Sequence, residues 1–173
     1  MKPLRLKMQA FGSYGKETTI DFEKVNQNLF LITGDTGAGK TTIFDAIVFA
    51  LYGEASSSLN KKEGVVLQSQ YVDFDSEPYV ELVFSEDRDE KREIYTVRRV
   101  PRHLKTITRG ANKGKPKENT GSVSLIMPDG LEYPSKEADR KLQETVGLTK
   151  SQFMQVAMIA PVSYTHLRAT RRS

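Results

Sequence analysis

Polar and apolar residues alternate near the start of the chain, which predicts a pair of antiparallel strands. In the stretch LRLKMQAF the apolar residues Leu4, Leu6 and Met8 are separated by polar ones. A period of two is typical of a strand with one buried face. The turn GSYG follows, and the stretch ETTIDF then predicts the partner strand.

A different pattern follows at residues 28–33, where the stretch NLFLIT is almost wholly apolar. A short apolar run is typical of an interior strand that is buried on both faces of a sheet. Glycines come next, and then a helix is predicted over residues 40–52, because Ile43, Ile47 and Leu51 recur every four residues. Gly53 occupies the position where a helix often ends in a left-handed residue.

The second half of the chain predicts more strands and two helices. YVELVF (79–84) and REIYTVRRV (92–100) read as strands joined by the charged turn SEDRDEK, and SVSLIM (122–127) as a third strand that ends at a Pro-Asp-Gly turn. Between them, residues 109–121 are predicted to form a flexible loop. Two helices follow. The first is predicted to start at the N-cap Ser135, to bury the stripe of Ala138, Leu142 and Val146, and to end at Gly147. The second is predicted from the capping-box spacing of Thr149 and Gln152.

Length and composition favour one globular domain. The chain has 173 residues, of which 38% are hydrophobic and 28% charged, and it has no cysteine. The absence of cysteine excludes disulfides and thiolate metal sites. The apolar run near residues 43–51 is far shorter than the ~20 residues that span a bilayer, and the first residues lack the continuous apolar core of a secretory signal. We therefore expect a cytoplasmic protein with no membrane partner.

Positive charge is concentrated in one segment, although the net charge is only +4. Eight Lys or Arg residues and no acid lie between Arg98 and Lys117. Such a cluster can contact phosphates. It can equally be a solvated hairpin loop, and the sequence leaves both interpretations open.

The glycine-rich stretch at residues 34–41 carries the clearest chemistry. It reads Gly-Asp-Thr-Gly-Ala-Gly-Lys-Thr, which matches the P-loop pattern of Gly, four residues, Gly-Lys-Ser/Thr. Gly34, Gly37 and Gly39 allow positive φ, so that successive N–H groups can point inward toward an anion. The helix that begins at Lys40 directs its positive end to the same place.

This motif predicts a triphosphate site for ATP with Mg²⁺. Lys40 supplies a charge for the β- and γ-phosphates, and the hydroxyl of Thr41 is the expected Mg²⁺ ligand. Hydrolysis also needs an acid that positions the attacking water, usually at the end of a second buried strand. The two apolar runs that are followed by acids, VELVFSED and SLIMPD, read instead as hairpin ends. The binding half of an ATPase site is therefore visible, and the catalytic acid is not.

Three stretches together resemble the SbcC family, the large ATPase subunits of bacterial SbcCD nucleases, which are related to SMC proteins. These are LRLKMQAFGSYGKETTIDF, LFLITGDTGAGKTTIFDAIVFALYG and LTKSQFMQVAMIA, and the resemblance covers about residues 1–160. It implies the N-terminal lobe of an ABC/SMC-type P-loop head, an α/β fold with a mixed sheet and an antiparallel hairpin layer over about residues 79–127.

The resemblance also implies function and partners. In this family a second head lobe, distant in the chain, completes the ATPase, and two heads form a homodimer that binds ATP and DNA and controls an SbcD-like nuclease subunit. Carried over to this sequence, Lys40 would act in catalysis and Ser13 would lie near the nucleotide. The residues expected to bind ATP are Ser13, Gly34, Asp35, Thr36, Gly37, Ala38, Gly39, Lys40, Thr41 and Thr42.

One departure concerns the end of the chain. The family continues after MIA with a glutamine, whereas this sequence has Pro161. We therefore predict a lobe over residues 1–160 and a non-native or disordered tail over residues 161–173. The alternatives are a piece of a RecF- or RecN-type repair ATPase and an inactive truncated fragment. A long heptad-patterned continuation with a central Cys-x-x-Cys would favour SbcC over RecF.

Overall fold

A six-stranded antiparallel sheet forms the centre of the structure. The computed structural model describes residues 1–24, 30–56 and 67–157. In this part the strand order of the large sheet is β2-β1-β3-β4-β7-β8. The bounds are β1 (Lys2–Gln9), β2 (Thr18–Asp21), β3 (Tyr79–Arg88), β4 (Lys91–Val100), β7 (Ser122–Ile126) and β8 (Glu132–Pro134).

The predicted pair of N-terminal strands is confirmed. β1 pairs antiparallel with β2, and Leu6 lies opposite Ile20. The apolar side chains Leu4, Leu6 and Met8 are buried, as their alternation predicts. On its other side β1 pairs with β3, so this strand has a neighbour along both edges.

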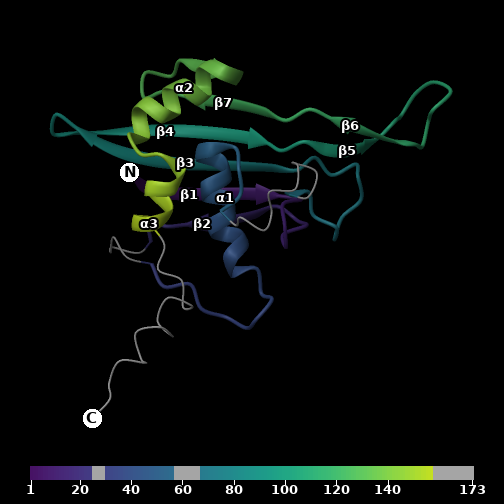
Figure 1. The fold of residues 1–173 in the computed structure, drawn as a ribbon, viewed down its shortest axis with the longest axis horizontal. Coiled ribbons are helices and arrows are strands. Elements are labelled where there is room, and N and C mark those ends of the chain that lie inside the picture. Colours follow the sequence, from purple (N-terminus) through teal and green to yellow (C-terminus); the bar gives the residue numbers. More distant parts are fainter. Residues whose placement is uncertain (25–29, 57–66, 158–173) are drawn as a thin grey trace, which may run out of the picture.

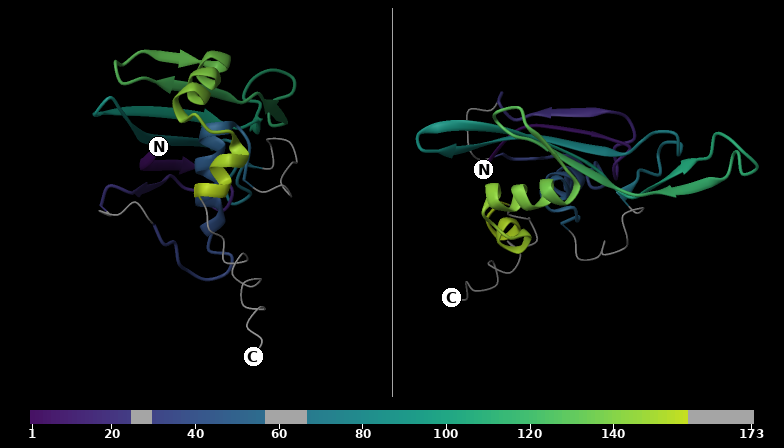
Figure 2. Two further views of the ribbon diagram at one scale, coloured as in Figure 1. Left: turned by 60° about the vertical axis from the view of Figure 1, so that its left-hand side comes forward. Right: turned by 90° about the horizontal axis from the view of Figure 1, so that it is seen from above.

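Three helices cover one face of the sheet. They are α1 (Lys40–Tyr52), α2 (Ser135–Val146) and α3 (Lys150–Ala157), and the view from above shows them all on the same side (Figure 2). Leu82, Phe84 and Val97 from the sheet and Val48 and Phe49 from α1 belong to one buried cluster. The core therefore lies between the sheet and α1.

Helix α1 begins and ends where the sequence predicts. It ends at Gly53, which has φ 75° and whose N–H donates to the carbonyl of Phe49. Its buried residues are not confined to the predicted stripe, since Ala46 and Phe49 are buried while Ile47 is only half-buried. A helix that is apolar on most sides is typical of a core position.

The hairpin of β3 and β4 is longer than predicted. The strands continue through the charged stretch to the pair Arg88 and Lys91. Only Asp89 and Glu90 form the turn, and both have positive φ, 48° and 63°. Two-residue turns of this kind match the twist of antiparallel strands, so the ladder can extend to the turn despite its polar sequence.

The predicted loop at 109–121 is wrong in part. A second, two-stranded sheet pairs β5 (His103–Thr106) with β6 (Pro116–Asn119). This small hairpin projects beyond the end of the large sheet (Figure 1). Only His103 of its eight strand residues is buried, and four are exposed. The sequence therefore has little apolar alternation, and a search for period two misses the hairpin.

The buried strand predicted at residues 28–33 is also wrong where it can be checked. Residues 28 and 29 lie outside the described part. Residues 30–33 form no strand, and Leu31 and Ile32 are 87% and 42% exposed. An interior strand needs neighbours on both edges, and no described strand pairs with this segment.

The ends of the two last helices differ in how well they were predicted. Ser135 is not an N-cap: it is the first residue of α2, it has φ 53°, and Pro134 precedes the helix without a side-chain cap. Gly147 ends α2 in the left-handed region, as predicted. The capping box before α3 is confirmed, since the N–H of Thr149 donates to Gln152 Oε1 at 2.9 Å and the N–H of Gln152 donates to Thr149 Oγ1 at 3.3 Å.

The α/β class and the antiparallel hairpin layer are confirmed. Every described strand pair is antiparallel, so the parallel pairs of a mixed sheet are not seen within residues 1–24, 30–56 and 67–157. The tail predicted at 161–173 lies outside the described residues. None of the helices in the described part has the length and hydrophobicity to span a membrane.

Candidate functional site

The glycine-rich loop leads directly into α1 and adopts the backbone conformation that its glycines permit. Gly34, Gly37 and Gly39 have φ of 151°, 86° and 82°. A side chain other than hydrogen is strained at such angles. Gly39 also precedes the first helical residue, so the turn into the helix depends on a left-handed residue at this position.

The side chain of Lys40 folds back across the loop. Its ammonium donates to the carbonyl of Gly34 and to the carbonyl of Asp35, both at 2.6 Å. The loop is closed further by the N–H of Ala38, which donates to the carbonyl of Asp35 at 3.1 Å. A positive charge is thereby held at the mouth of the loop, within reach of any anion that enters it.

The N-terminus of α1 keeps its backbone donors available. No side chain caps it, and no acidic residue lies in its first turn. The first N–H groups of a helix have no partner within the helix, and the helix dipole places partial positive charge there. Together with Lys40 and the loop amides, this arrangement suits phosphate groups.

The turn that follows β1 packs against this loop. Ser13 Oγ lies 3.2 Å from Thr42 Oγ1, at hydrogen-bonding distance. A Cβ atom on Gly39 would lie 3.1 Å from the ring of Tyr14. Ser13, expected near the nucleotide by resemblance alone, is thus placed beside the loop by the structure.

Sequence reasoning missed two other members of this turn, Gly12 and Tyr14. The only signal for them is the pair of glycines in FGSYG, which indicates a turn but not what the turn touches. The ring of Tyr14 is partly buried, and burial raises the pKa of its hydroxyl above the ordinary value of 10.0. It therefore remains a neutral group beside the loop at physiological pH.

We expect Gly12→Ala to destabilise the protein by about 1–3 kcal/mol. Gly12 has φ 53°, and an added Cβ would lie 2.6 Å from Cγ2 of Thr42. The matched control is Gly130→Ala, which has φ 86° but no atom within 4 Å of the added Cβ. Urea unfolding should show a larger decrease in the free energy of unfolding for Gly12→Ala than for Gly130→Ala. Equal losses would mean that contact between the turn and α1 contributes little.

The loop also fits a magnesium ion held partly by phosphate oxygens. Thr41, the expected ligand, is exposed at the start of α1. No three His, Cys, Asp or Glu side chains gather as a metal site in the described part of the chain. Mg²⁺ commonly takes one or two protein ligands, with substrate phosphates and waters completing its shell. A single hydroxyl beside a phosphate site is consistent with that preference.

Catalytic acids do not contact the loop. Within the described residues, the hydrogen bonds and ion pairs of residues 34–42 include no carboxylate side chain. Asp45, the acid within α1, accepts hydrogen bonds from the N–H and hydroxyl of Ser56. It therefore holds the segment that follows the helix.

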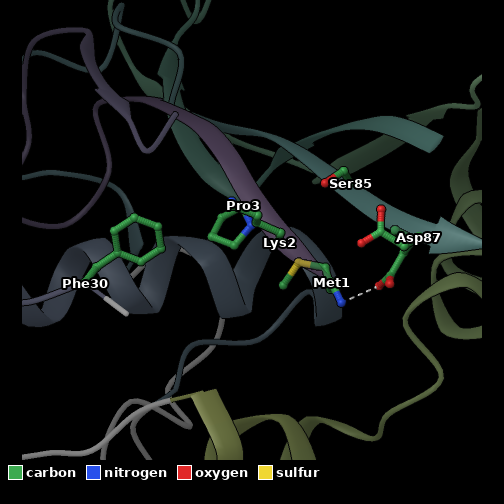
Figure 3. Close-up of a pocket in the computed structure, with 7 residues that line it drawn as sticks. Met1, Lys2, Pro3, Phe30, Ser85 and Asp87 are labelled. Carbon is green, nitrogen blue, oxygen red and sulfur yellow. Dashed lines mark ion pairs between the residues drawn. The ribbon is translucent and has the colours of Figure 1, made fainter. Parts of the chain in front are cut away.

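A cavity of about 400 Å³ lies elsewhere, beside the start of β1. Figure 3 shows Met1, Pro3 and Phe30 along it, with Asp87 near the chain start. The Met1 ammonium is paired there with Glu86 at 2.9 Å. The lining holds both signs of charge, with Lys2 and the Met1 ammonium beside Glu86 and Asp87, and it includes neither a glycine loop nor a helix start, so the glycine loop remains the candidate site.

The chain is similar to known proteins over most of its length. A family model described as an AAA domain matches residues 5–163. The SbcC subunit of nuclease SbcCD from Vibrio cholerae serotype O1 is 34% identical over 163 residues, which cover 92% of this chain and 15% of that protein. The protein of the same name from Staphylococcus epidermidis is 58% identical over 74 residues, which cover 42% of this chain and 7% of that protein.

Solved structures with some likeness include two SMC proteins. A chain from work on ATP-driven dimerization and DNA-stimulated activation of SMC ATPases aligns with a TM-score of 0.49 and 16% identity, covering 97% of this chain and 98% of that one. The SMC head domain from Thermotoga maritima aligns with a TM-score of 0.42 and 20% identity, covering 77% and 39%.

Proposed function

The chain belongs to the AAA domain family, and from that premise we propose that it is the ATP-binding N-terminal lobe of an SbcC-like ATPase that controls DNA end processing by a partner nuclease. The observation that carries the proposal is the glycine loop, which combines the ammonium of Lys40, bonded to the carbonyls of Gly34 and Asp35, with the uncapped start of α1. The names of the relatives, which are subunits of SbcCD nucleases, support the nuclease partner.

The loop residues have distinct proposed roles. The amides of Gly34 to Thr42 cradle the phosphates, and Lys40 stabilises the charge that develops on the γ-phosphate as water attacks in line. The hydroxyl of Thr41 would be the protein ligand of a Mg²⁺ ion, which would supply positive charge to offset that of the phosphates. Ser13 holds Thr42, and so fixes the side of the loop nearest to β1.

Completion of the ATPase is assigned to a second head lobe and a second copy of the head. The chain spans about 15% of the length of the curated relatives that it matches over most of its own length. Leu31 and Ile32, directly before the loop, are apolar and exposed. Large exposed apolar residues beside a site are typical of a surface that another lobe covers. DNA binding and a cytoplasmic location are part of the same proposal.

Titration of the whole chain with fluorescently labelled ATP and Mg²⁺ tests nucleotide binding directly. Saturable binding that requires Mg²⁺ is the expected result. Binding that unlabelled ATP cannot displace would contradict the assignment. Inorganic phosphate release, measured on the same samples, tests the next expectation.

We expect this chain alone to show no ATP turnover above a Lys40→Ala control. In the described part of the structure, residues 34–42 form no hydrogen bond or ion pair with a carboxylate side chain, so no acid from another element is held there to orient the attacking water. We expect the wild-type chain to release phosphate at the same rate as the Lys40→Ala control. Robust turnover by the wild-type chain would show that a catalytic acid lies within these 173 residues.

A further inference from the structure

The basic segment noted in the sequence separates into paired and unpaired cations in the structure. Arg98 pairs with Glu81, Arg99 with Asp139, and Arg102 with Glu118. Each of these arginines therefore has a structural partner. Five other cations of the segment are exposed and have no acidic partner among the described residues: Lys105, Arg109, Lys113, Lys115 and Lys117.

These five cations all lie on the projecting hairpin of β5 and β6 and on its connecting turn (Figure 1). Lys105 and Lys117 are directly opposite one another across the two strands. Like charges in directly opposed positions destabilise a strand pair. An anion bound between them would offset this repulsion.

The chemistry of the hairpin favours a phosphate backbone over a protein partner. No large exposed hydrophobic residue lies between residues 103 and 119. Protein interfaces draw most of their binding energy from a few buried aromatic or Arg anchors set among apolar contacts. Contacts from Lys and Arg to phosphates need no such anchors and carry no sequence preference.

The side-chain amide of Gln68 links the hairpin to a segment outside its own sheet. Its Nε2 donates to the carbonyl of Leu104 at 2.9 Å, and the N–H of Leu104 donates to its Oε1, also at 2.9 Å. Leu104 lies in β5, which belongs to a sheet separate from the large one. These two bonds therefore orient the small sheet from outside it.

The segment that carries Gln68 is also hydrogen-bonded to the turn of Gly12 and Ser13, which lies beside the glycine loop. Gln68 forms a β-bridge with Phe11, and the N–H of Gly12 donates to the carbonyl of Leu67 at 2.9 Å. Gly12 and Ser13 then contact Thr42 at the loop. A continuous set of hydrogen bonds and contacts thus joins the glycine loop to the basic hairpin.

We propose that Gln68 is a positioning residue that couples nucleotide binding at the glycine loop to binding of a nucleic-acid phosphate backbone at the β5–β6 hairpin. The coupling rests on the proposed function, because it requires that the loop bind ATP. Because the Gly12–Ser13 turn and the Gln68 segment link the two sites, a ligand that restricts their motion at one site lowers the cost of ordering them when the second ligand binds. Thermodynamic linkage requires the effect to be reciprocal.

Two pairs of measurements test the proposal with a 30-base-pair DNA duplex as the probe. In the wild-type chain, saturating duplex should tighten labelled-ATP binding about fivefold, and ATP should tighten duplex binding by the same factor. In Gln68→Ala and Gln68→Glu, each ligand alone should bind within about twofold of wild type while the coupling factor falls to about one. Thermal unfolding establishes that each variant is folded, and the glutamate variant keeps the side-chain length.

A charge comparison tests the hairpin itself, without nucleotide. Lys105→Gln with Lys117→Gln should weaken duplex binding about tenfold and reduce the slope of log affinity against log salt by about two. The matched control removes two exposed lysines outside the hairpin, Lys16 and Lys91, and should leave both quantities nearly unchanged.

Each contrary outcome would contradict a different part of the proposal. Equal duplex affinity for the hairpin and control variants, or displacement of the duplex by low concentrations of poly-glutamate, would overturn the phosphate-backbone surface. Normal coupling in both Gln68 variants would overturn the role of Gln68. Failure of the wild-type chain to bind ATP would overturn the proposed function and the coupling with it, while the duplex measurements would still decide the hairpin.

Discussion

Lys40→Ala should weaken ATP binding by at least about a hundredfold. In the structure the ammonium of Lys40 is held 2.6 Å from two loop carbonyls, where it can turn to incoming phosphates. A hydrogen bond to a charged group contributes about 1.5–3 kcal/mol. The loss of two such bonds costs roughly 3 kcal/mol, and every 1.4 kcal/mol is about tenfold in affinity.

Equilibrium titration with labelled ATP measures this effect, and Lys91→Ala is the matched control. Lys91 is an exposed lysine in the turn region of β3 and β4, so its loss changes the net charge equally without touching the loop. Unfolding curves of both variants separate lost binding from lost structure. If Lys40→Ala binds ATP as tightly as Lys91→Ala does, the P-loop assignment is wrong.

Leu82→Ala should destabilise the protein by about 3 kcal/mol, within the range of about 2–5 kcal/mol for truncation of a buried leucine. Leu82 is fully buried in β3 and belongs to the cluster beneath α1. Truncation removes apolar contacts and leaves a cavity that the two flanking strands, β1 and β4, prevent from collapsing. Urea unfolding measures the change.

The adjacent residue is the control for this prediction. Val83 follows Leu82 in the same strand and therefore points to the opposite face of the sheet, where it is only half-buried. Val83→Ala should cost less than about 1 kcal/mol, because a partly exposed methyl group is lost without a sealed cavity. A comparable loss of stability in Leu82→Ala and Val83→Ala would mean that both faces of the sheet are covered equally.

Local sequence patterns predicted the elements whose geometry depends on neighbouring residues in the chain. The limits of α1 follow from its apolar period and from Gly53, whose left-handed φ ends the helix. The loop before it follows from three glycines that adopt positive φ. The capping box of Thr149 and Gln152 likewise depends only on contacts within four consecutive residues.

Elements that depend on distant partners were predicted less well. The apolar run at 28–33 indicates burial but does not say by what, and residues 30–33 have no strand partner in the described part of the chain. The β5–β6 hairpin has little apolar alternation to reveal it. In both cases the deciding quantity is backbone pairing, which the side-chain pattern does not encode.

Three features can be recognised without the structure, because each depends on residue types at close spacing: the triphosphate motif, the helix that follows it and the basic cluster. Three others follow from the packing of the folded chain: which cations remain unpaired, the position of Gly12 and Ser13 against Thr42, and the link that Gln68 forms between this turn and the hairpin. These contacts join residues that are distant in the sequence, such as Ser13 and Thr42, separated by 29 positions, and Gln68 and Leu104, separated by 36. They arise when the sheet and α1 pack together, and no local pattern of hydrophobicity or charge specifies them.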